Sequence, residues 1–232
     1  MLLLNIDKDF VSFGLTVKET DLCIWATKDL TKMAFESVLK YRFQLEEYIK
    51  QYPLFKSTIK PLSIDYNAPE IVKSMMQASQ KAGVGPMAAV AGAIAEYVGM
   101  DLLSHTNKVV VENGGDIFIK VDKKMQIKIY AGQFNNTGKT AIEVDPDHTP
   151  LGVCTSSGTI GHSFSYGKAD AVTAVASSAI LADAAATALA NHINKVADMD
   201  KAIRLASNIK GLKGAVLIKD GIKKVYGRVI MV

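Results

Sequence analysis

Residues 151–191 read LGVCTSSGTIGHSFSYGKADAVTAVASSAILADAAATALAN, and this stretch decides how we interpret the rest of the chain. From Ser178 onward it is dominated by Ala, Leu and Ile. A helix beginning there would be apolar on nearly every side, which is typical of a buried helix. Asp183 and Thr187 interrupt the apolar run before Asn191, and their spacing places all three on one side of the helix.

Asp183 is the residue of this helix that most needs an explanation. A carboxylate among alanines in a protein interior costs several kcal/mol unless its charge is compensated. Asp and Thr oxygens one helical turn apart suit a hard cation such as Mg2+, which binds through one or two protein oxygens plus substrate phosphates. The structural alternative is that Asp183 caps a neighbouring loop or pairs with a lysine. The sequence therefore predicts a metal site at Asp183 and Thr187, with capping as the alternative.

The composition is that of a globular protein, with 232 residues of which 49% are hydrophobic, and we expect a single domain over residues 1–232. The net charge is only +4 and the lysines are spread along the chain, so nucleic acid is not expected as a partner. Cys23 and Cys154 have neither disulfide nor zinc-ligand spacing. The first apolar run is too short for a secretory signal, and no run reaches the roughly 18 to 20 residues of a membrane span. We therefore expect a cytoplasmic protein without a membrane partner.

Helix-like and strand-like patterns follow one another without a regular alternation, which indicates an α+β fold rather than a doubly wound sheet. We expect an early hairpin in residues 10–26, an antiparallel meander over 108–145, and a hairpin around Asp220-Gly221. Gly92, inside a helix of small apolar residues, predicts that another backbone approaches closely there. The expected helices cover residues 31–52, 67–83, 86–99, 178–191 and 194–208.

Two short loops have residues that can contact a ligand. The sequence ENGGD at 112–116 follows a β-branched strand, and its glycines would let backbone N–H groups approach a phosphate or a flavin edge. The sequence TSSG at 155–158 could supply hydroxyl and N–H donors to a diphosphate. Each loop is also compatible with an ordinary turn.

Cys154 and His162 suggest a nucleophile and its base, because they lie eight residues apart in one loop-and-strand segment. A lone cysteine in a strand more often behaves as a small buried hydrophobic residue, and we favour that interpretation. His162 lies in a polar loop, where it either contacts a ligand or is solvated.

In this order, ENGGD, a short Ser-Gly loop, the strand VTAVA and the helix ADAAATALA resemble the ApbE superfamily of FAD:protein FMN transferases. The resemblance covers about residues 109–191, and the whole chain is more similar to a shorter uncharacterised branch found in archaea and bacteria. It implies an α+β, ApbE-like fold in which antiparallel or mixed sheets pack with several helices. The buried Ala-rich helix would lie near the site.

The resemblance also implies FAD and Mg2+ as cofactors and an acceptor protein as the partner. Mg2+ would be bound by Asp183 and Thr187, and Asp183 and His162 would be the catalytic residues. An acceptor Thr would attack the FMN phosphorus and release AMP, or water would do so in FAD hydrolysis. The residues expected to bind the flavin nucleotide are Asn113, Gly114, Gly115, Asp116, Thr155, Ser156, Ser157 and Gly158.

The chain also departs from the superfamily pattern. The HxxDPxTG segment is absent, the short connection GHSFSYG takes its place, and Thr159 stands where an Asp usually follows the Ser-Gly pair. These departures bear on the transfer reaction more than on the fold or the metal site. Two alternatives stay open: a non-catalytic flavin- or nucleotide-binding protein and, as the resemblance to the uncharacterised branch implies, a factor in anaerobic sulfide assimilation to homocysteine, in which Cys154 would be the residue of interest. A homodimer is also left open.

Overall fold

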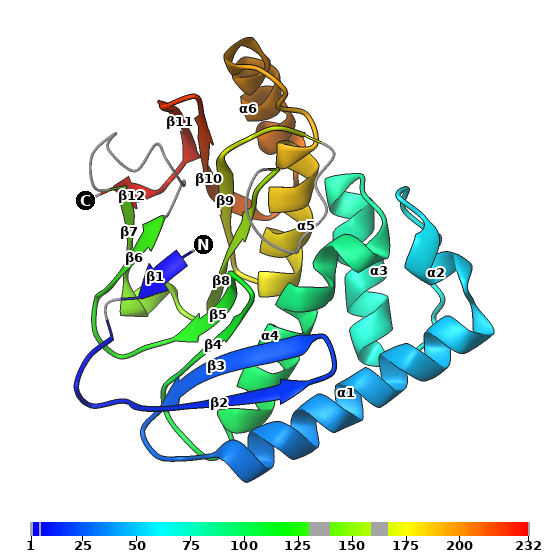
Figure 1. Cartoon of the computed structure of the whole chain (residues 1–232), viewed down its shortest axis with the longest axis vertical. Coiled ribbons are helices and arrows are strands. Elements are labelled where there is room, and N and C mark those ends of the chain that lie inside the picture. Colours follow the sequence, from blue (N-terminus) through cyan, green and yellow to red (C-terminus); the bar gives the residue numbers. More distant parts are fainter. Residues whose placement is uncertain (1, 5, 130–139, 159–166, 232) are drawn as a thin grey trace.

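The middle layer of the molecule is an eight-stranded antiparallel sheet. The structure is a computed structural model that describes residues 2–4, 6–129, 140–158 and 167–231. Helices cover one face of this sheet, and a small four-stranded sheet covers the other (Figure 1). The strands of the large sheet, in order across it, are β11 (Ile222–Gly227), β10 (Leu212–Lys219), β9 (Ala171–Ala176), β8 (Leu151–Ser156), β5 (Asp116–Lys120), β4 (Val109–Asn113), β3 (Thr20–Ala26) and β2 (Val11–Val17).

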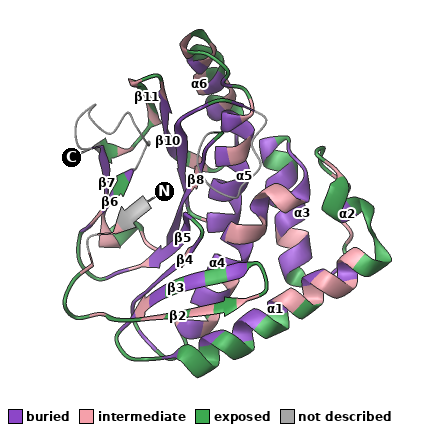
Figure 2. Cartoon of the chain, viewed as in Figure 1, coloured by how far each residue is buried: buried purple, intermediate pink, exposed green. Residues whose placement is uncertain are grey.

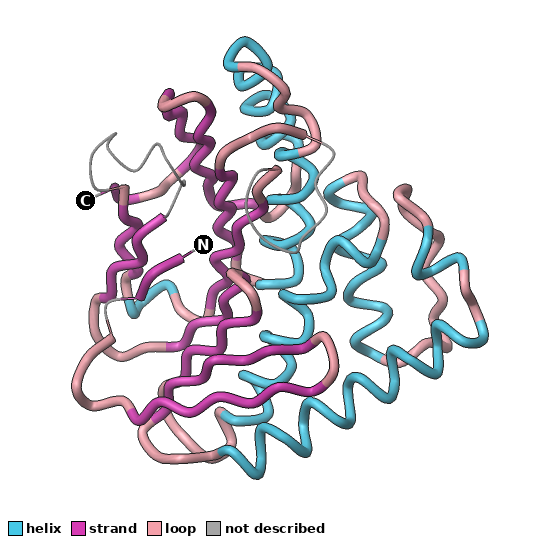
Figure 3. The backbone as a smooth tube through the Cα atoms, in the orientation of Figure 1, coloured by secondary structure: helices cyan, strands magenta, loops and turns pink. Residues whose placement is uncertain are grey.

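The small sheet and the helices complete the described architecture. The strands of the small sheet, in order, are β1 (Leu2–Leu4), β6 (Met125–Ile129), β7 (Ala141–Val144) and β12 (Ile230–Met231). The helices are α1 (Thr31–Gln51), α2 (Leu54–Ser57), α3 (Glu70–Ala82), η1 (Pro86–Ala89), α4 (Val90–Leu102), η3 (Pro146–His148), α5 (Ala179–Ala190), η4 (Val196–Asp198) and α6 (Met199–Asn208). Strands and helices lie on opposite sides of the molecule (Figure 3), so the α+β expectation is confirmed.

Two hydrophobic cores share the large sheet, because successive side chains of a strand point to opposite faces. Phe118 faces the helices and joins one core, whereas Ile117 and Ile119 face the small sheet and join the other. The central strands are therefore buried on both faces, and they are almost entirely purple in Figure 2.

Local signals set several element boundaries as predicted. The Asp29 carboxylate accepts a hydrogen bond of 2.8 Å from the Thr31 N–H at the start of α1. Gly83 ends α3 with a φ of 75°. Asp220 and Gly221 both have positive φ values, 49° and 76°, as the two-residue hairpin turn between β10 and β11 requires.

The predicted meander over 108–145 is wrong at one step. β4 pairs with β5 and β6 pairs with β7, both antiparallel as predicted, but β5 pairs with β8 instead of β6, and β6 and β7 belong to the small sheet, where β6 also pairs with β1. The helices cover only one face of the large sheet, and Ile127 and Ile142 of the small sheet help to bury the other.

Within the part of the chain that the structure describes, no single helix is long and apolar enough to cross a membrane. By length and composition, the segments Glu70–Ala82 and Pro86–Leu102 meet that test only together, and they are bent by 103° relative to each other.

Candidate functional site

Helix α5 is buried between the large sheet and α4, because two glycines let its backbone come close to both. A Cβ atom on Gly152 of β8 would lie 2.2 Å from the Cα atom of Ala179, and one on Gly92 of α4 would lie 2.4 Å from the Ala179 carbonyl oxygen. The close approach predicted at Gly92 is confirmed. Every residue of α5 except the half-buried Thr187 is buried, as the apolar run predicts.

The Asp183 side chain points from α5 toward the first turn of α4. It is only 8% exposed, and its Oδ2 atom accepts a hydrogen bond of 2.9 Å from the Gly92 N–H. The N-terminus of a helix carries partial positive charge, so α4 partly stabilises this carboxylate. The capping alternative is therefore correct in part. Among the described residues Asp183 forms no ion pair with a lysine or arginine, so no full positive charge compensates it.

A second acid, Asp116, lies at the start of β5. It is 3% exposed, and its Cα pairs with that of Asn113 in β4 and that of Cys154 in β8. Its Oδ1 atom is buried and has no hydrogen-bond partner in the described part of the chain, and the same holds for the Ser156 hydroxyl. Buried polar atoms without partners are uncommon in native proteins and often mark a missing ion or ligand.

Strand alternation places these polar side chains on the helix-facing side of the sheet. Cys154 belongs to the core on that side, so Ser156, two residues later, points the same way. Asp116 points there because Phe118 does. The Asn113 amide is also directed there and donates a hydrogen bond of 3.1 Å to the carbonyl of Ala91 in α4. Asn113, Asp116, Ser156 and Asp183 thus form one buried polar group, which we call the acid cluster.

Burial is the main cause of the raised pKa values of Asp116 and Asp183 in the acid cluster. Burial, reinforced by the Asp183 charge, holds the pKa of Asp116 well above its usual range. Burial also raises the pKa of Asp183 to about 7, although the hydrogen bond from Gly92 acts in the opposite direction. The two carboxylates are close enough to repel each other, so a bound divalent cation would compensate both.

The two loops predicted to bind a ligand differ in how open they are. Gly114 and Gly115 adopt φ values of 63° and 106°, and among the described residues a Cβ atom at either position would meet no atom within 4 Å. Gly114 is exposed and its backbone is open to a ligand, whereas Gly115 is buried and its carbonyl accepts a hydrogen bond of 3.3 Å from the Thr155 N–H. In the second loop the Thr155 and Thr173 hydroxyls hydrogen-bond to each other at 2.8 Å, and the Ser157 hydroxyl donates to the Asp170 carbonyl at 2.8 Å. Both side chains are therefore already used within the protein.

Gly158 has a structural role in the second loop. Its N–H donates to the Ala169 carbonyl at 3.0 Å, and a Cβ atom there would lie 2.0 Å from the Gly167 carbonyl oxygen. Only glycine fits this approach between the loop and the segment before β9. Of the four TSSG residues, Ser156 is thus the one whose side chain joins the acid cluster.

The remaining predicted site residues have different outcomes. Thr187 follows Asp183 by one helical turn, while His162 lies outside the described residues. The thiol of Cys154 is buried and donates to the Ala179 carbonyl at 3.3 Å. Burial and the two nearby acids raise the pKa of Cys154 well above its usual range, so it is a neutral thiol and a poor nucleophile.

Glu96 is a residue whose position the sequence pattern did not reveal. It lies near the middle of α4, and its Oε2 atom accepts hydrogen bonds from the Ser178 hydroxyl at 2.8 Å and from the Ile180 N–H at 3.2 Å. Burial raises the pKa of Glu96. It therefore caps the N-terminus of α5, while Asp183 of α5 caps α4. The sequence signal that could have revealed this role is a charged residue within an apolar stretch of helix.

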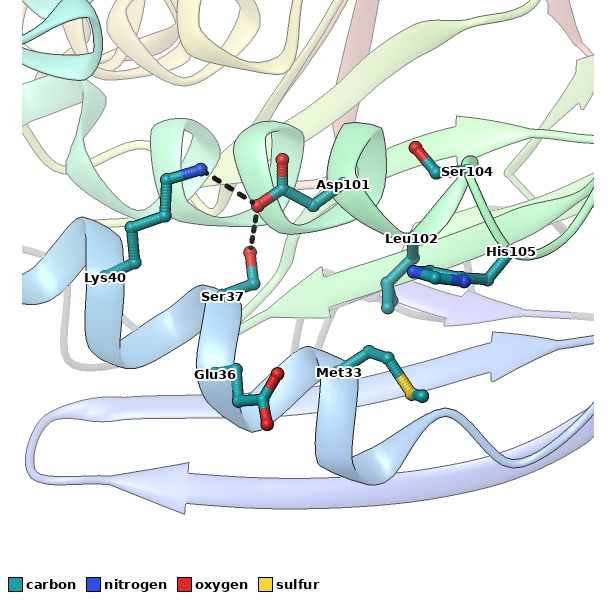
Figure 4. A pocket seen from close by; sticks show the side chains of 8 residues that line it. All are labelled: Met33, Glu36, Ser37, Lys40, Asp101, Leu102, Ser104 and His105. Carbon is teal, nitrogen blue, oxygen red and sulfur yellow. Dashed lines mark hydrogen bonds and ion pairs between the residues drawn. The ribbon is translucent and has the colours of Figure 1, made fainter.

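A cleft of about 370 Å³ between α1 and the end of α4 is separate from the acid cluster (Figure 4). Lys40 and Ser37 of α1 point at Asp101 of α4, with contacts of 3.4 Å and 2.9 Å to the same carboxylate oxygen. None of the predicted site residues lines this cleft. Its lining residues are Met33, Glu36, Ser37, Lys40, Asp101, Leu102, Ser104 and His105.

Comparison with solved structures identifies the fold. Flavin transferase ApbE from Vibrio cholerae has a TM-score of 0.58 and 14% identity, over 94% of this chain and 96% of that one. Pseudomonas stutzeri flavinyl transferase ApbE in its apo form has a TM-score of 0.59 and 13% identity, over 94% of each chain. At this identity the likeness establishes the shared fold.

Sequence comparison identifies the family. A UPF0280 protein of Methanospirillum hungatei is 42% identical over 199 residues, which cover 84% of this chain and 80% of that protein. A UPF0280 protein of Methanocaldococcus jannaschii is 41% identical over 216 residues, covering 89% and 88%. The family model described as "AbpE bacteria" matches residues 4–221. The chain therefore belongs to the AbpE bacteria family, within an ApbE-like branch whose members are named UPF0280 proteins.

Proposed function

We propose that this protein binds FAD together with Mg2+ and transfers FMN from FAD to a threonine of an acceptor protein. In this reaction the acceptor hydroxyl oxygen forms a bond to the FMN phosphorus, the phosphoanhydride P–O bond breaks, and AMP leaves with the bridging oxygen. When water replaces the acceptor, the same chemistry yields FMN and AMP. Membership of the AbpE bacteria family and the fold shared with two proteins named flavin or flavinyl transferase support this proposal.

The observation that carries the proposal is the buried pair Asp116 and Asp183. Two buried carboxylates that repel each other and have no lysine or arginine partner among the described residues suit a hard divalent cation, and the unpartnered Oδ1 atom of Asp116 is available as a ligand. We propose that Asp183, Thr187 and Asp116 hold Mg2+. When bound, the ion would neutralise negative charge on the diphosphate and on the departing AMP.

The surrounding residues have complementary roles in this proposal. The exposed Gly114 leaves room for a ligand to reach the backbone of this turn, and the Ser156 hydroxyl, which has no partner among the described residues, can donate to a phosphate oxygen. The Asn113 amide is fixed by Ala91, so it keeps this turn at the first turn of α4. These contacts would hold the phosphorus in line with its acceptor.

The test is release of AMP from FAD by the purified protein, with and without Mg2+. We expect Mg2+-dependent AMP formation that falls by at least about 100-fold in Asp183→Asn, because that residue would bind the ion directly. Asp101→Asn is the matched control, since Asp101 is an acid of α4 that is satisfied by Ser37 and Tyr41 in the separate cleft. No AMP with any divalent metal would reject the hydrolase activity, and no AMP after addition of a threonine-containing acceptor protein would reject the transferase activity as well.

The same samples distinguish a binding protein from an enzyme. The hydrogen bond from Gly92 to Asp183 gives that carboxylate a structural role even without a metal, which favours a non-catalytic flavin carrier as the second candidate. Saturable quenching of FAD fluorescence without AMP release would establish the carrier. The environment of Cys154 does not favour sulfur chemistry, because its thiol is buried and neutral.

A further inference from the structure

Helix α1 has an apolar face that the protein's own core does not use. Phe35, Leu39 and Phe43 are 45%, 44% and 66% exposed, and their spacing of four aligns them in one stripe along the helix. The opposite side of α1 packs on the core through residues that include Ala34 and Val38. The helix runs along an outer edge of the molecule, and its outward side is exposed (Figures 1 and 2). Aligned exposed aromatic residues of this kind indicate an interaction surface.

The stripe is symmetric about Leu39. Phe35 precedes Leu39 by four residues and Phe43 follows it by four, so the pattern is the same in both chain directions. If two copies of α1 pack antiparallel around a twofold axis at Leu39, Phe35 of each copy lies level with Phe43 of the other. A twofold interface requires such self-complementarity, because the same patch is used by both copies.

The charges beside the stripe complement each other in the same arrangement. By their helical spacing, Glu36, Lys40 and Glu47 lie along one flank of the stripe, and Lys32 lies at its N-terminal end; within one copy the Lys40 side chain turns toward Asp101 of α4. In the antiparallel pair, the Cα positions of Lys32 and of Glu47 in the second copy differ by about 1.5 Å along the helix axis. Those of Glu36 and of Lys40 in the second copy differ by about 3 Å. Each cation therefore meets an anion.

The ion pairs that these charged residues form within one copy are weak enough to be replaced by ion pairs between two copies. Lys40 donates to the Tyr41 hydroxyl at 3.0 Å and contacts Asp101 at 3.4 Å, and Glu47 contacts Lys50; the Lys40 and Glu47 side chains are 54% and 40% exposed. Exposed pairs of this kind contribute about 0 to 1 kcal/mol each. Pairing across two copies would therefore cost little.

The size of the stripe fits the centre of a dimer interface. The exposed parts of Phe35, Leu39 and Phe43 amount to roughly 300 Å² per copy, taking the areas typical of such side chains. A standard interface buries about 800 Å² on each partner, with an apolar centre and a polar rim. The charged residues beside the stripe would supply that rim.

We propose that α1 is the contact between two copies of this chain, packed antiparallel around a twofold axis at Leu39. This inference does not depend on the flavin chemistry proposed above. A mixed row of acids and bases next to the stripe would be an unsuitable surface for a uniformly charged partner, whereas it matches its own reversed copy.

The first test is sedimentation velocity of the full chain without FAD. We expect a dimer whose dissociation constant rises at least about 30-fold in Leu39→Glu, because two carboxylates would then meet at the centre of the interface. Ile222→Glu is the control, since Ile222 is similarly exposed at 48% but lies on β11. Circular dichroism of each variant confirms folding. A monomeric wild-type chain at roughly 100 µM, or a Leu39→Glu dimer as tight as the wild type, would overturn the proposal.

The second test uses charge reversal at Glu36 and Lys40. Glu36→Lys alone and Lys40→Glu alone should each weaken the dimer, because like charges then face each other across the axis. The double variant E36K/K40E restores opposite charges and should recover most of the wild-type affinity. Additive weakening in the double variant would contradict the antiparallel register.

Discussion

At the scale of single residues, the acids of the candidate site differ in how well the protein satisfies them. Asp183 has the Gly92 N–H and the positive end of α4, whereas the Oδ1 atom of Asp116 is buried without a partner among the described residues. Breaking the hydrogen bonds of a buried polar group typically costs about 1 to 3 kcal/mol. The fold therefore retains an unfavourable group beside a second acid, which is the pattern expected where binding requires it.

The raised pKa of Asp183 makes stability depend on pH. Because the pKa is about 7 in the folded protein and near 3.8 in the unfolded chain, the folded state binds the proton more tightly. This contribution is fully present below about pH 4 and is lost as pH rises through about 7. In EDTA, the free energy of unfolding should therefore fall more between about pH 5 and 7.5 in the wild type than in Asp183→Asn. Urea titrations measure this difference, and equal slopes would contradict the prediction.

Magnesium should stabilise the folded protein through the acid cluster. A ligand at 100 times its dissociation constant adds about 2.7 kcal/mol to the free energy of unfolding. We expect Mg2+ to raise the melting temperature of the wild type and of Asp101→Asn, but not of Asp116→Asn or Asp183→Asn. Retained stabilisation in Asp116→Asn would remove Asp116 from the metal site while leaving Asp183 and Thr187 as ligands.

At the scale of elements, α5 and α4 support each other through reciprocal caps. Asp183 of α5 accepts from the first turn of α4, and Glu96 of α4 accepts from the first turn of α5. Gly92 makes this possible, because its missing side chain lets the two backbones come within contact distance. The position of Asp183 therefore depends on a glycine in another helix.

Replacing Gly92 with Ala tests this dependence. In an exposed helix the change would stabilise by about 0.5 to 1 kcal/mol, but here the new Cβ would lie 2.4 Å from the Ala179 carbonyl oxygen, so the helices must separate. We expect a loss of about 1 to 3 kcal/mol in chemical denaturation, together with weaker Mg2+ binding. Gly14→Ala is the control, because its Cβ would be 3.3 Å from the Leu22 carbonyl oxygen. Equal stability of both variants would show that α4 and α5 separate freely.

The elements that were predictable are those whose signals are local. The Ala-rich run, the Asp220-Gly221 turn and the close approach at Gly92 are each encoded within a few residues, and the structure confirms them. Pairing between distant strands is not encoded in this way. Asp116 could be predicted as a loop residue near a ligand, but its place beside Asp183 depends on β5 pairing with β8, which is not visible in the local pattern.

The same limit applies to the exposed face of α1. Met33 shares the helical spacing of the buried Val38 and Tyr41, yet it is 38% exposed because it lines the cleft beside α1 rather than the core. The stripe of Phe35, Leu39 and Phe43 is also apolar, so α1 has hydrophobic residues on two sides. Periodicity alone does not distinguish the side that faces the core.

At the scale of the whole molecule, the large sheet is the element common to both hydrophobic cores. Its strands β5 and β9 present apolar side chains to the helices on one face and to the small sheet on the other. Such strands have continuous apolar sequences, which reveal burial without revealing how many layers surround them. The three-layer arrangement could not be predicted for this reason, whereas the α+β class could.

Because the two cores share their strands, we predict that the chain unfolds as one cooperative unit, in line with a single domain over residues 1–232. Trp25, the one tryptophan of the sequence, packs against the core between the sheets, so its fluorescence reports that layer. Far-ultraviolet circular dichroism reports mainly the helices on the other face. The two signals should give the same urea midpoint. Phe118→Ala, on the helix side, should reduce the free energy of unfolding by about 3 to 5 kcal/mol and so lower both midpoints together. If only the circular dichroism midpoint shifted, the layers would be separate folding units and the acid cluster could open without the small sheet.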